Sequence, residues 1–206
     1  MDEAGCYDRP VPRGDEVRPV PGASVKFTYE DFLSFPDDGK RHEIIDGEHY
    51  VTPSPNTKHQ RIVVNLTGLL HAHLSRHPGG HLFVAPFDVL FAEHDVVEPD
   101  LIYVSRARAD ILTTQHIRGA PDLLVEILSP STRKTDEVTK RKRYEHFGVL
   151  EYWVVDPELD AIKVYRRVDE AFVRVAELSV ERQDVLTTPL LPEFAAPLGE
   201  IFVSPM

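Results

Sequence analysis

The sequence predicts an α/β fold in which helices cover a β-sheet. Three observations support this prediction. The apolar run at 123–128 is typical of a strand buried on both faces. Residues 57–76 carry apolar side chains at helical spacing, so one side of this helix should cover a sheet. Segments 151–156, 161–167 and 171–177 are separated by short turns, which predicts antiparallel strands that complete the sheet.

The composition is that of a globular domain. The chain has 206 residues, of which 42% are hydrophobic and 28% charged. We expect the proline-rich residues 1–24 to form a flexible tail, and residues 25–206 to form a single domain. No run approaches the roughly 18–20 apolar residues that cross a membrane, and the N-terminus has no signal pattern. The single cysteine, Cys6, excludes an internal disulfide. We therefore expect a cytoplasmic protein with no membrane partner.

The charge distribution bears on partners. A net charge of -11 argues against tight, nonspecific coating of nucleic acid. Residues 133–143 nevertheless form a local basic segment, with six Lys or Arg and two acids. Such a run is usually a solvated helix face, and it could also contact a polyanion.

Near the N-terminus, Thr28-Tyr29-Glu30-Asp31 resembles a capping box and predicts a short helix that ends near Pro36. The pair Asp46-Gly47, between two short apolar segments, predicts a hairpin over 42–51. The register of that hairpin decides whether Glu43 points inward or outward.

The clearest helix, at 57–76, should end before Gly79-Gly80. Its C-terminal end holds His71, His73 and His77. The last two are spaced to share a metal, but histidines are also favoured there by the helix dipole, and we prefer the second interpretation.

Residues 82–92 and 96–104 predict two strands joined by a turn at 93–95. Each contains an acid, Asp88 or Asp100. If the pairing is centred on the turn, these two acids lie opposite each other, whereas a slip of one residue places them on different faces.

The stretch 122–144 carries the functional signal. Glu126 interrupts the buried strand, and a charge there is costly unless it is paired or binds a cation. Ser129-Pro130-Ser131-Thr132 ends the strand and supplies a helix start. In the basic helix that follows, Asp136, Lys140 and Tyr144 are spaced by four and share one face.

Asp100 and Glu126, with Asp88 and Glu43 as further candidates, would form a site of hard oxygen ligands at one edge of the sheet. Such a site suits Mg²⁺ or Mn²⁺, which can activate water and stabilise charge on a phosphodiester. Lys140 is the candidate to orient water or hold the phosphate. The competing interpretation is structural, because strand acids often form cross-strand ion pairs, and periodicity alone favours it.

Several short motifs, in this order and spacing, resemble the Uma-type family of restriction endonucleases over roughly residues 26–168. They are Glu98-Pro99-Asp100-Leu101, Leu124 to Thr132, the set Asp136, Lys140 and Tyr144, Gly148-Val149, and Glu151 to Asp156, with Glu43 to Glu48 and Ser54 to His59 upstream.

This resemblance implies a PD-(D/E)XK nuclease-like core, with a mixed sheet flanked by helices and a divalent metal at the acids. Asp100 matches the Asp of the PD element and Glu126 matches the acid of the (D/E)XK element. Leu128 stands where the generic pattern has lysine, and the family places its lysine on the following helix, here Lys140. Glu43 matches an early glutamate and would be an extra ligand.

We therefore expect a Mg²⁺-dependent or Mn²⁺-dependent endonuclease acting on DNA, with Asp100 and Glu126 on the metal and Lys140 and Glu43 in catalysis. Two alternatives stay open: a nucleic-acid-binding or regulatory protein that keeps the fold but cleaves weakly, and a hydrolase for another phosphate substrate. A homodimer would suit cleavage of both strands. The expected contacts to the DNA backbone come from Arg133, Lys134, Arg141, Lys142 and Arg143, and the further site candidates are Asp88 and Tyr144.

Overall fold

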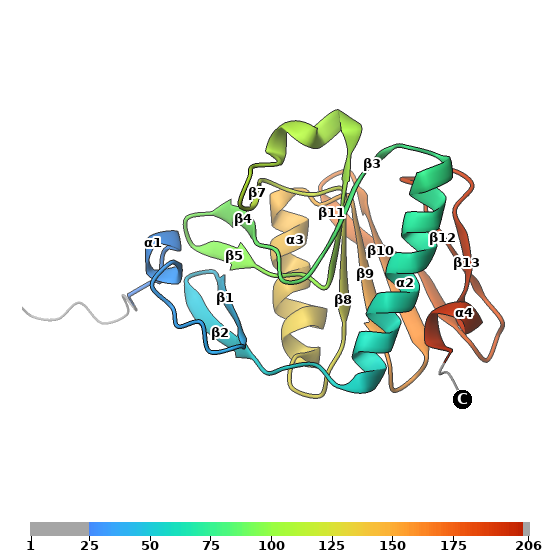
Figure 1. The fold of residues 1–206 in the computed structure, drawn as a ribbon, viewed down its shortest axis with the longest axis horizontal. Coiled ribbons are helices and arrows are strands. Elements are labelled where there is room, and N and C mark those ends of the chain that lie inside the picture. The colour runs from blue at the N-terminus through green and yellow to red at the C-terminus, as the bar shows by residue number, and fades with distance from the viewer. Residues whose placement is uncertain (1–24, 204–206) are drawn as a thin grey trace, which may run out of the picture.

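A six-stranded mixed sheet lies at the centre of residues 25–203, which are the residues that this computed structural model describes (Figure 1). The predicted tail at 1–24 lies outside them. The strand order is β11-β10-β9-β8-β6-β3. Central β8 pairs parallel with β9 and antiparallel with β6. The bounds are β3 Gly80–Val84, β6 Leu101–Ser105, β8 Leu123–Ile127, β9 Glu151–Asp156, β10 Ala161–Val168 and β11 Ala171–Ser179.

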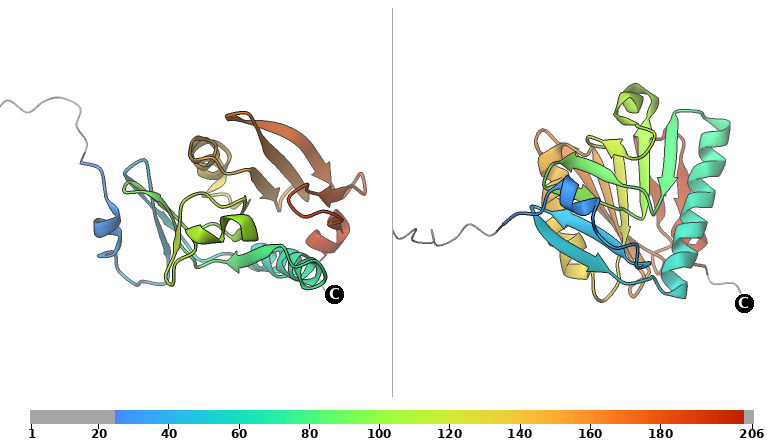
Figure 2. Two further views of the ribbon diagram at one scale, coloured as in Figure 1. Left: turned by 90° about the horizontal axis from the view of Figure 1, so that it is seen from above. Right: turned by 60° about the vertical axis from the view of Figure 1, so that its left-hand side comes forward.

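Helices cover both faces of this sheet, as predicted. Helix α2 (Thr57–Arg76) lies on one face, and α3 (Arg141–Phe147) lies on the other (Figure 2). A π-helical segment, η2 (Thr135–Lys140), leads directly into α3. Because side chains of a strand alternate between faces, Val125 of β8 packs in the core beneath α2, whereas Leu124 packs in the core that contains Tyr144 of α3.

A second sheet, in the order β2-β1-β5-β4-β7, lies beside the first. Its bounds are β1 Arg41–Ile45, β2 Glu48–Thr52, β4 Val89–Ala92, β5 Asp95–Val97 and β7 Ile117–Arg118. The predicted hairpin is confirmed as β1–β2, with Glu43 opposite Tyr50. Asp46 and Gly47 both have positive φ, 52° and 79°, which the primed turn of a two-residue hairpin requires.

The remaining elements cover the ends of the sheets. Helix α1 (Tyr29–Phe32) begins with the predicted capping box between Thr28 and Asp31. Helix α2 ends at Arg76, where the ring of buried His73 stacks on His77 with centroids 4.8 Å apart. The other elements are η1 Arg106–Ile111, β12 Val185–Thr187, β13 Ala195–Pro197 and α4 Leu198–Phe202. Within residues 25–203, the helices lack the length and apolar character that crossing a membrane needs.

The prediction of two long strands at 82–92 and 96–104 is wrong. The first divides into β3 and β4, and the second into β5 and β6, so that β3 pairs with β6 in one sheet and β4 pairs with β5 in the other. Pro86 and Pro99 stand at the two breaks, because proline has no N–H to donate to a ladder. The backbone N–H of Ala85, not Asp88, donates to the carbonyl of Asp100. Neither of the two registers considered for Asp88 and Asp100 occurs, because the two acids lie outside the paired strands.

Candidate active site

Four carboxylates and a lysine meet at a pocket of about 210 Å³. Glu43 comes from β1, Asp100 precedes β6, Glu126 lies in β8, and Asp136 and Lys140 come from η2. All five side chains are buried, with exposed fractions of 2–4%. Residues from four separate segments of the chain therefore form one polar cluster between the two sheets.

The local structure explains why these side chains converge. Glu126 and Leu124 lie on the same face of β8. The side chain of Glu126 therefore points toward η2 and α3 rather than toward α2. On β1, the alternation of side chains places Arg41 and Glu43 on one face. Asp136 and Lys140 are four residues apart in the helical segment and approach each other, as their spacing predicts.

Lys140 lies at the centre of the cluster. Its Nζ is 2.8 Å from Glu43 Oε1, 3.1 Å from Glu126 Oε1 and 3.5 Å from Asp136 Oδ1. Burial alone would lower the pKa of Lys140, but the negative charges of these carboxylates outweigh it and raise the pKa well above its usual value. Lys140 is therefore a permanent cation that donates hydrogen bonds.

Asp100 is held by donors on both of its oxygens. Arg41 donates to Oδ1 at 2.6 Å, whereas Oδ2 accepts from His59 Nε2 at 3.1 Å and from the backbone N–H of Ile127 at 2.8 Å. Burial would raise the pKa of Asp100, but the hydrogen bond to His59 and the charges beside it lower the pKa below its usual value. Asp100 is therefore ionised.

The other acids titrate differently. Burial raises the pKa of Glu126 well above its usual value, although Lys140 opposes this and the hydroxyl of Tyr144 donates to Oε1 at 2.7 Å. Burial likewise raises the pKa of Asp136 to about 6. Asp136 Oδ1 is buried without a hydrogen-bond partner among the residues described, since Lys140 is too distant for a good hydrogen bond. The pocket thus contains an oxygen ligand that the protein itself does not satisfy.

The pocket carries an excess of negative charge. Four carboxylates face two permanent cations, Lys140 and Arg41, so two negative charges are uncompensated when all four acids are ionised. Among residues 25–203, no three His, Cys, Asp or Glu side chains already have the arrangement of a metal site. The Lys140 ammonium instead lies between three of the carboxylates. Oxygen ligands, the unsatisfied Asp136 oxygen and the excess charge fit a hard divalent cation.

The five basic residues predicted to contact DNA are not brought together. Arg133 donates to Asp156 at 2.5 Å and to Glu158 at 2.8 Å. Arg143 forms an ion pair with buried Asp95. The guanidinium of Arg141 lies over the ring of Tyr165, 5.3 Å from its centroid. Lys134 and Lys142 are exposed.

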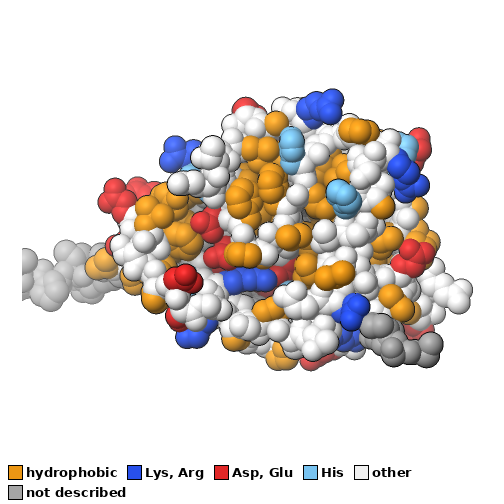
Figure 3. Space-filling model, viewed as in Figure 1, with side chains coloured by type: hydrophobic (Ala, Val, Ile, Leu, Met, Phe, Trp, Pro, Cys, Tyr) orange, Lys and Arg blue, Asp and Glu red, His pale blue; other side chains and the backbone are white. Residues whose placement is uncertain are grey.

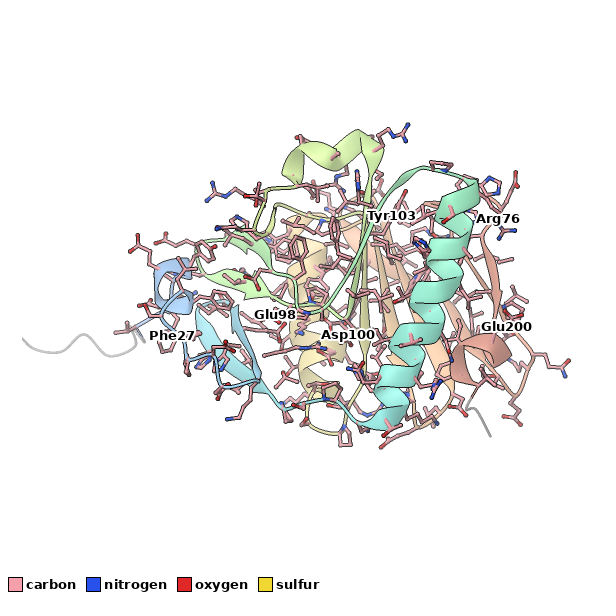
Figure 4. All side chains as sticks on the ribbon, in the orientation of Figure 1. Phe27, Arg76, Glu98, Asp100, Tyr103 and Glu200 are labelled. Carbon is pink, nitrogen blue, oxygen red and sulfur yellow. The ribbon has the colours of Figure 1, made fainter. Side chains whose placement is uncertain are left out.

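Asp88 does not line the pocket. It lies near Glu98, and Figure 4 shows Glu98 between the smaller sheet and Asp100. Burial, followed by the negative charges of Asp88 and Glu43, raises the pKa of Glu98 to about 7. Glu98 also borders a second hollow, which is lined by segment 52–55 as well, and its backbone N–H donates to Glu43 Oε1 at 2.9 Å.

Two residues of the site were missed by sequence reasoning. Arg41 stands two positions before Glu43 in the same strand. Because side chains two residues apart share a face of a strand, this spacing could have identified Arg41 from the sequence. His59 lies in the first turn of α2, and its Nδ1 is buried with no partner among the described residues. The role of His59 becomes apparent only in the structure, where α2 lies close to Asp100.

Comparisons with known proteins identify relatives of this chain. The family model Uma2, described as "Putative restriction endonuclease", matches residues 29–199. An uncharacterized protein of the cyanobacterium Synechocystis is 29% identical over 150 residues, which cover 70% of this chain and 76% of that protein.

A solved structure has the same fold. It is a "putative nuclease belonging to DUF820" from Anabaena variabilis, with a TM-score of 0.71 and 22% sequence identity. The match covers 85% of this chain and 97% of the other. The mixed α/β architecture predicted from the sequence is therefore shared with a solved protein.

Proposed function

Because the chain belongs to the Uma2 family of restriction-endonuclease-like proteins, we propose that it is a divalent-metal-dependent nuclease that hydrolyses phosphodiester bonds in DNA. One observation carries the proposal: carboxylates from β1, β8 and η2 converge on a single lysine in a pocket, with Asp100 beside them. A purely structural ion pair would not need four acids for two permanent cations.

The residues divide into groups with distinct roles. Asp100 and Glu126 would hold Mg²⁺ or Mn²⁺, with Glu43 as an additional oxygen ligand. The metal, when bound, would supply positive charge at the phosphate and a water of lowered pKa. Arg41 and His59 fix the orientation of Asp100, and Tyr144 fixes that of Glu126.

Lys140 would act as a donor and not as a base, because its raised pKa keeps it protonated. Its ammonium carries three N–H groups, so it can bind an oxygen of the phosphate or orient the attacking water while it contacts Glu126. This role follows from the charges around it, and it distinguishes Lys140 from exposed Lys134 and Lys142 on either side of it in the sequence.

The test is cleavage of supercoiled plasmid DNA with Mg²⁺ and with Mn²⁺, by the wild-type protein and by Glu126→Gln and Lys140→Met. We expect metal-dependent nicking that falls at least about a hundredfold in both variants, the lower end of what removal of one positioned electrostatic group costs. Glu93→Gln, at an exposed position outside the pocket, is the matched control and should cleave normally. Equal cleavage by all four proteins would contradict the proposal.

A second candidate function is DNA binding without cleavage. The observation that favours it is that Lys140 already contacts three carboxylates, which competes with any contact to a phosphate. Intact plasmid in every reaction, combined with retarded migration of the DNA, would support this alternative over the nuclease.

A further inference from the structure

The acids of the proposed site lie too deep for an intact duplex to reach. Asp100 and Glu126 are only 2% and 3% exposed. The pocket above them has a volume of about 210 Å³. A phosphate must enter this space to meet the carboxylates. In B-form DNA the phosphates lie on the rims of grooves about 6 and 12 Å wide, and both strands would have to follow.

Two short neutral segments form the mouth of the pocket. One is 52–56 between β2 and α2, and the other is 129–132 after β8. Both contain a Pro-Ser pair and neither contains a charged residue. The exposed residues of the two segments are Pro53, Ser54, Asn56, Pro130 and Ser131. The mouth therefore offers hydroxyl groups to one strand, and it lacks the Lys and Arg side chains that hold the backbone of a duplex.

Basic side chains elsewhere do not compensate for this. The three arginines of segment 133–143 are engaged within the chain, since Arg133 and Arg143 form ion pairs and Arg141 lies over the ring of Tyr165. The exposed bases of this segment are Lys134 and Lys142. On the face shown in Figure 3, the blue side chains are scattered singly and do not form a continuous patch. Because duplex binding depends on several simultaneous phosphate contacts, this surface is poorly suited to a long stretch of double helix.

A side pocket next to the mouth has an aromatic wall. It is lined by Tyr50 and shares Glu43, Thr52 and Asp136 with the main pocket. The ring of Tyr50 is partly exposed. Aromatic rings beside a narrow groove are the platforms on which unpaired bases stack. An unpaired nucleotide can therefore contact Tyr50 while its phosphate enters the main pocket.

From these observations we propose that the site takes an unpaired DNA strand and not the interior of an intact duplex. This inference rests on the proposed nuclease function, and it names the form of DNA that the pocket admits. A duplex would be cleaved only where its strands separate, because opening the helix must then precede entry of the phosphate.

The test compares an unstructured labelled oligonucleotide with the same strand annealed to its complement, both with Mg²⁺. We expect the unpaired strand to be cleaved at least about tenfold faster, which corresponds to about 1.4 kcal/mol in the activation free energy. A partial duplex with one unpaired end should be cleaved in that end. Equal or faster cleavage of the full duplex would overturn the inference while leaving the nuclease function intact.

A variant at the mouth tests the same idea independently. Ser131→Trp should narrow the mouth and slow cleavage of the unpaired strand at least about tenfold. This again corresponds to about 1.4 kcal/mol in the activation free energy. The matched control, Ser75→Trp, adds the same ring at an exposed position near the far end of α2 and should leave the rate unchanged. An unchanged rate in Ser131→Trp would contradict entry through this mouth.

Cleavage of neither substrate would contradict the proposed nuclease function. Fluorescence anisotropy with the same two oligonucleotides then decides the inference by itself. Tighter binding of the unpaired strand would support it, and equal or tighter binding of the duplex would overturn it.

Discussion

Lys140 determines the electrostatics of the site. Its ammonium is buried among three carboxylates, and without it those carboxylates would repel one another in a region from which most water is excluded. The same contacts bring a lysine 14 residues beyond Glu126 into hydrogen-bond contact with its carboxylate. The helical segment η2 brings its side chain back over the strand.

Glu98 provides a pH test at the scale of one residue. Its pKa is raised from 4.5 to about 7, so the folded state binds more protons than the unfolded state between these values. Stability should therefore fall as the pH rises through this range. Glu98→Gln removes this effect, and we expect its melting temperature to exceed that of the wild type at pH 8 and to match it at pH 4.

Melting temperatures measured across this pH range check the prediction. Exposed Glu93→Gln is the control and should follow the wild type at every pH. If Glu98→Gln were less stable than the wild type at pH 8, its carboxylate would be stabilised in the fold and the raised pKa would be wrong.

At the scale of elements, one ion pair holds the smaller sheet against α3. Arg143 of α3 binds Asp95 of β5, and Asp95 in turn accepts from the backbone N–H of Asp46 in the hairpin turn at 2.9 Å. Because β1 carries Glu43, this connection also sets the position of Glu43 relative to Lys140.

Arg143→Met would leave the charge of buried Asp95 without its partner. We expect a loss of about 3 kcal/mol in the free energy of unfolding, the lower end of the range for breaking a buried pair, because Arg143 is partly exposed. Urea denaturation measures this change. Lys142→Met, at the adjacent exposed position, should change the free energy by less than about 0.5 kcal/mol. Equal losses in the two variants would exclude a connecting role for Arg143.

Elements with strong local signals were predictable from the sequence. The apolar spacing of α2, the Asp-Gly turn of β1–β2 and the apolar run of β8 all specify structure within a few residues. The division of 82–104 was not predictable in this way, because it depends on which of two sheets each short segment joins.

The contacts of the site also differ in whether a local signal in the sequence predicts them. The spacing of Asp136 and Lys140 within one helical segment was visible in the sequence. The ion pair of Arg133 with Asp156 joins residues 23 positions apart, and nothing local indicates it. A basic run therefore predicted a DNA contact where the structure shows two arginines engaged within the chain.

At the scale of the whole molecule, the two sheets should unfold together. They share a core in which Ile45 and Val97 of the smaller sheet pack with Leu124 and Val154 of the larger one. The single tryptophan, Trp153, is fully buried in the larger sheet and reports on it by fluorescence. We expect urea transitions followed by fluorescence and by far-ultraviolet circular dichroism to coincide. A separate transition in the dichroism would show that the smaller sheet is an independent unit.

The most direct test of the central claim is a calorimetric titration of the wild-type protein and Glu126→Gln with Mg²⁺. The two uncompensated charges of the pocket predict one bound ion per chain at pH 8, and weaker binding at pH 5, where Asp136, with a pKa of about 6, takes up a proton. Glu126→Gln should lose this binding while it remains folded. If the variant bound Mg²⁺ as tightly as the wild type, the four carboxylates of the pocket would not be a metal site.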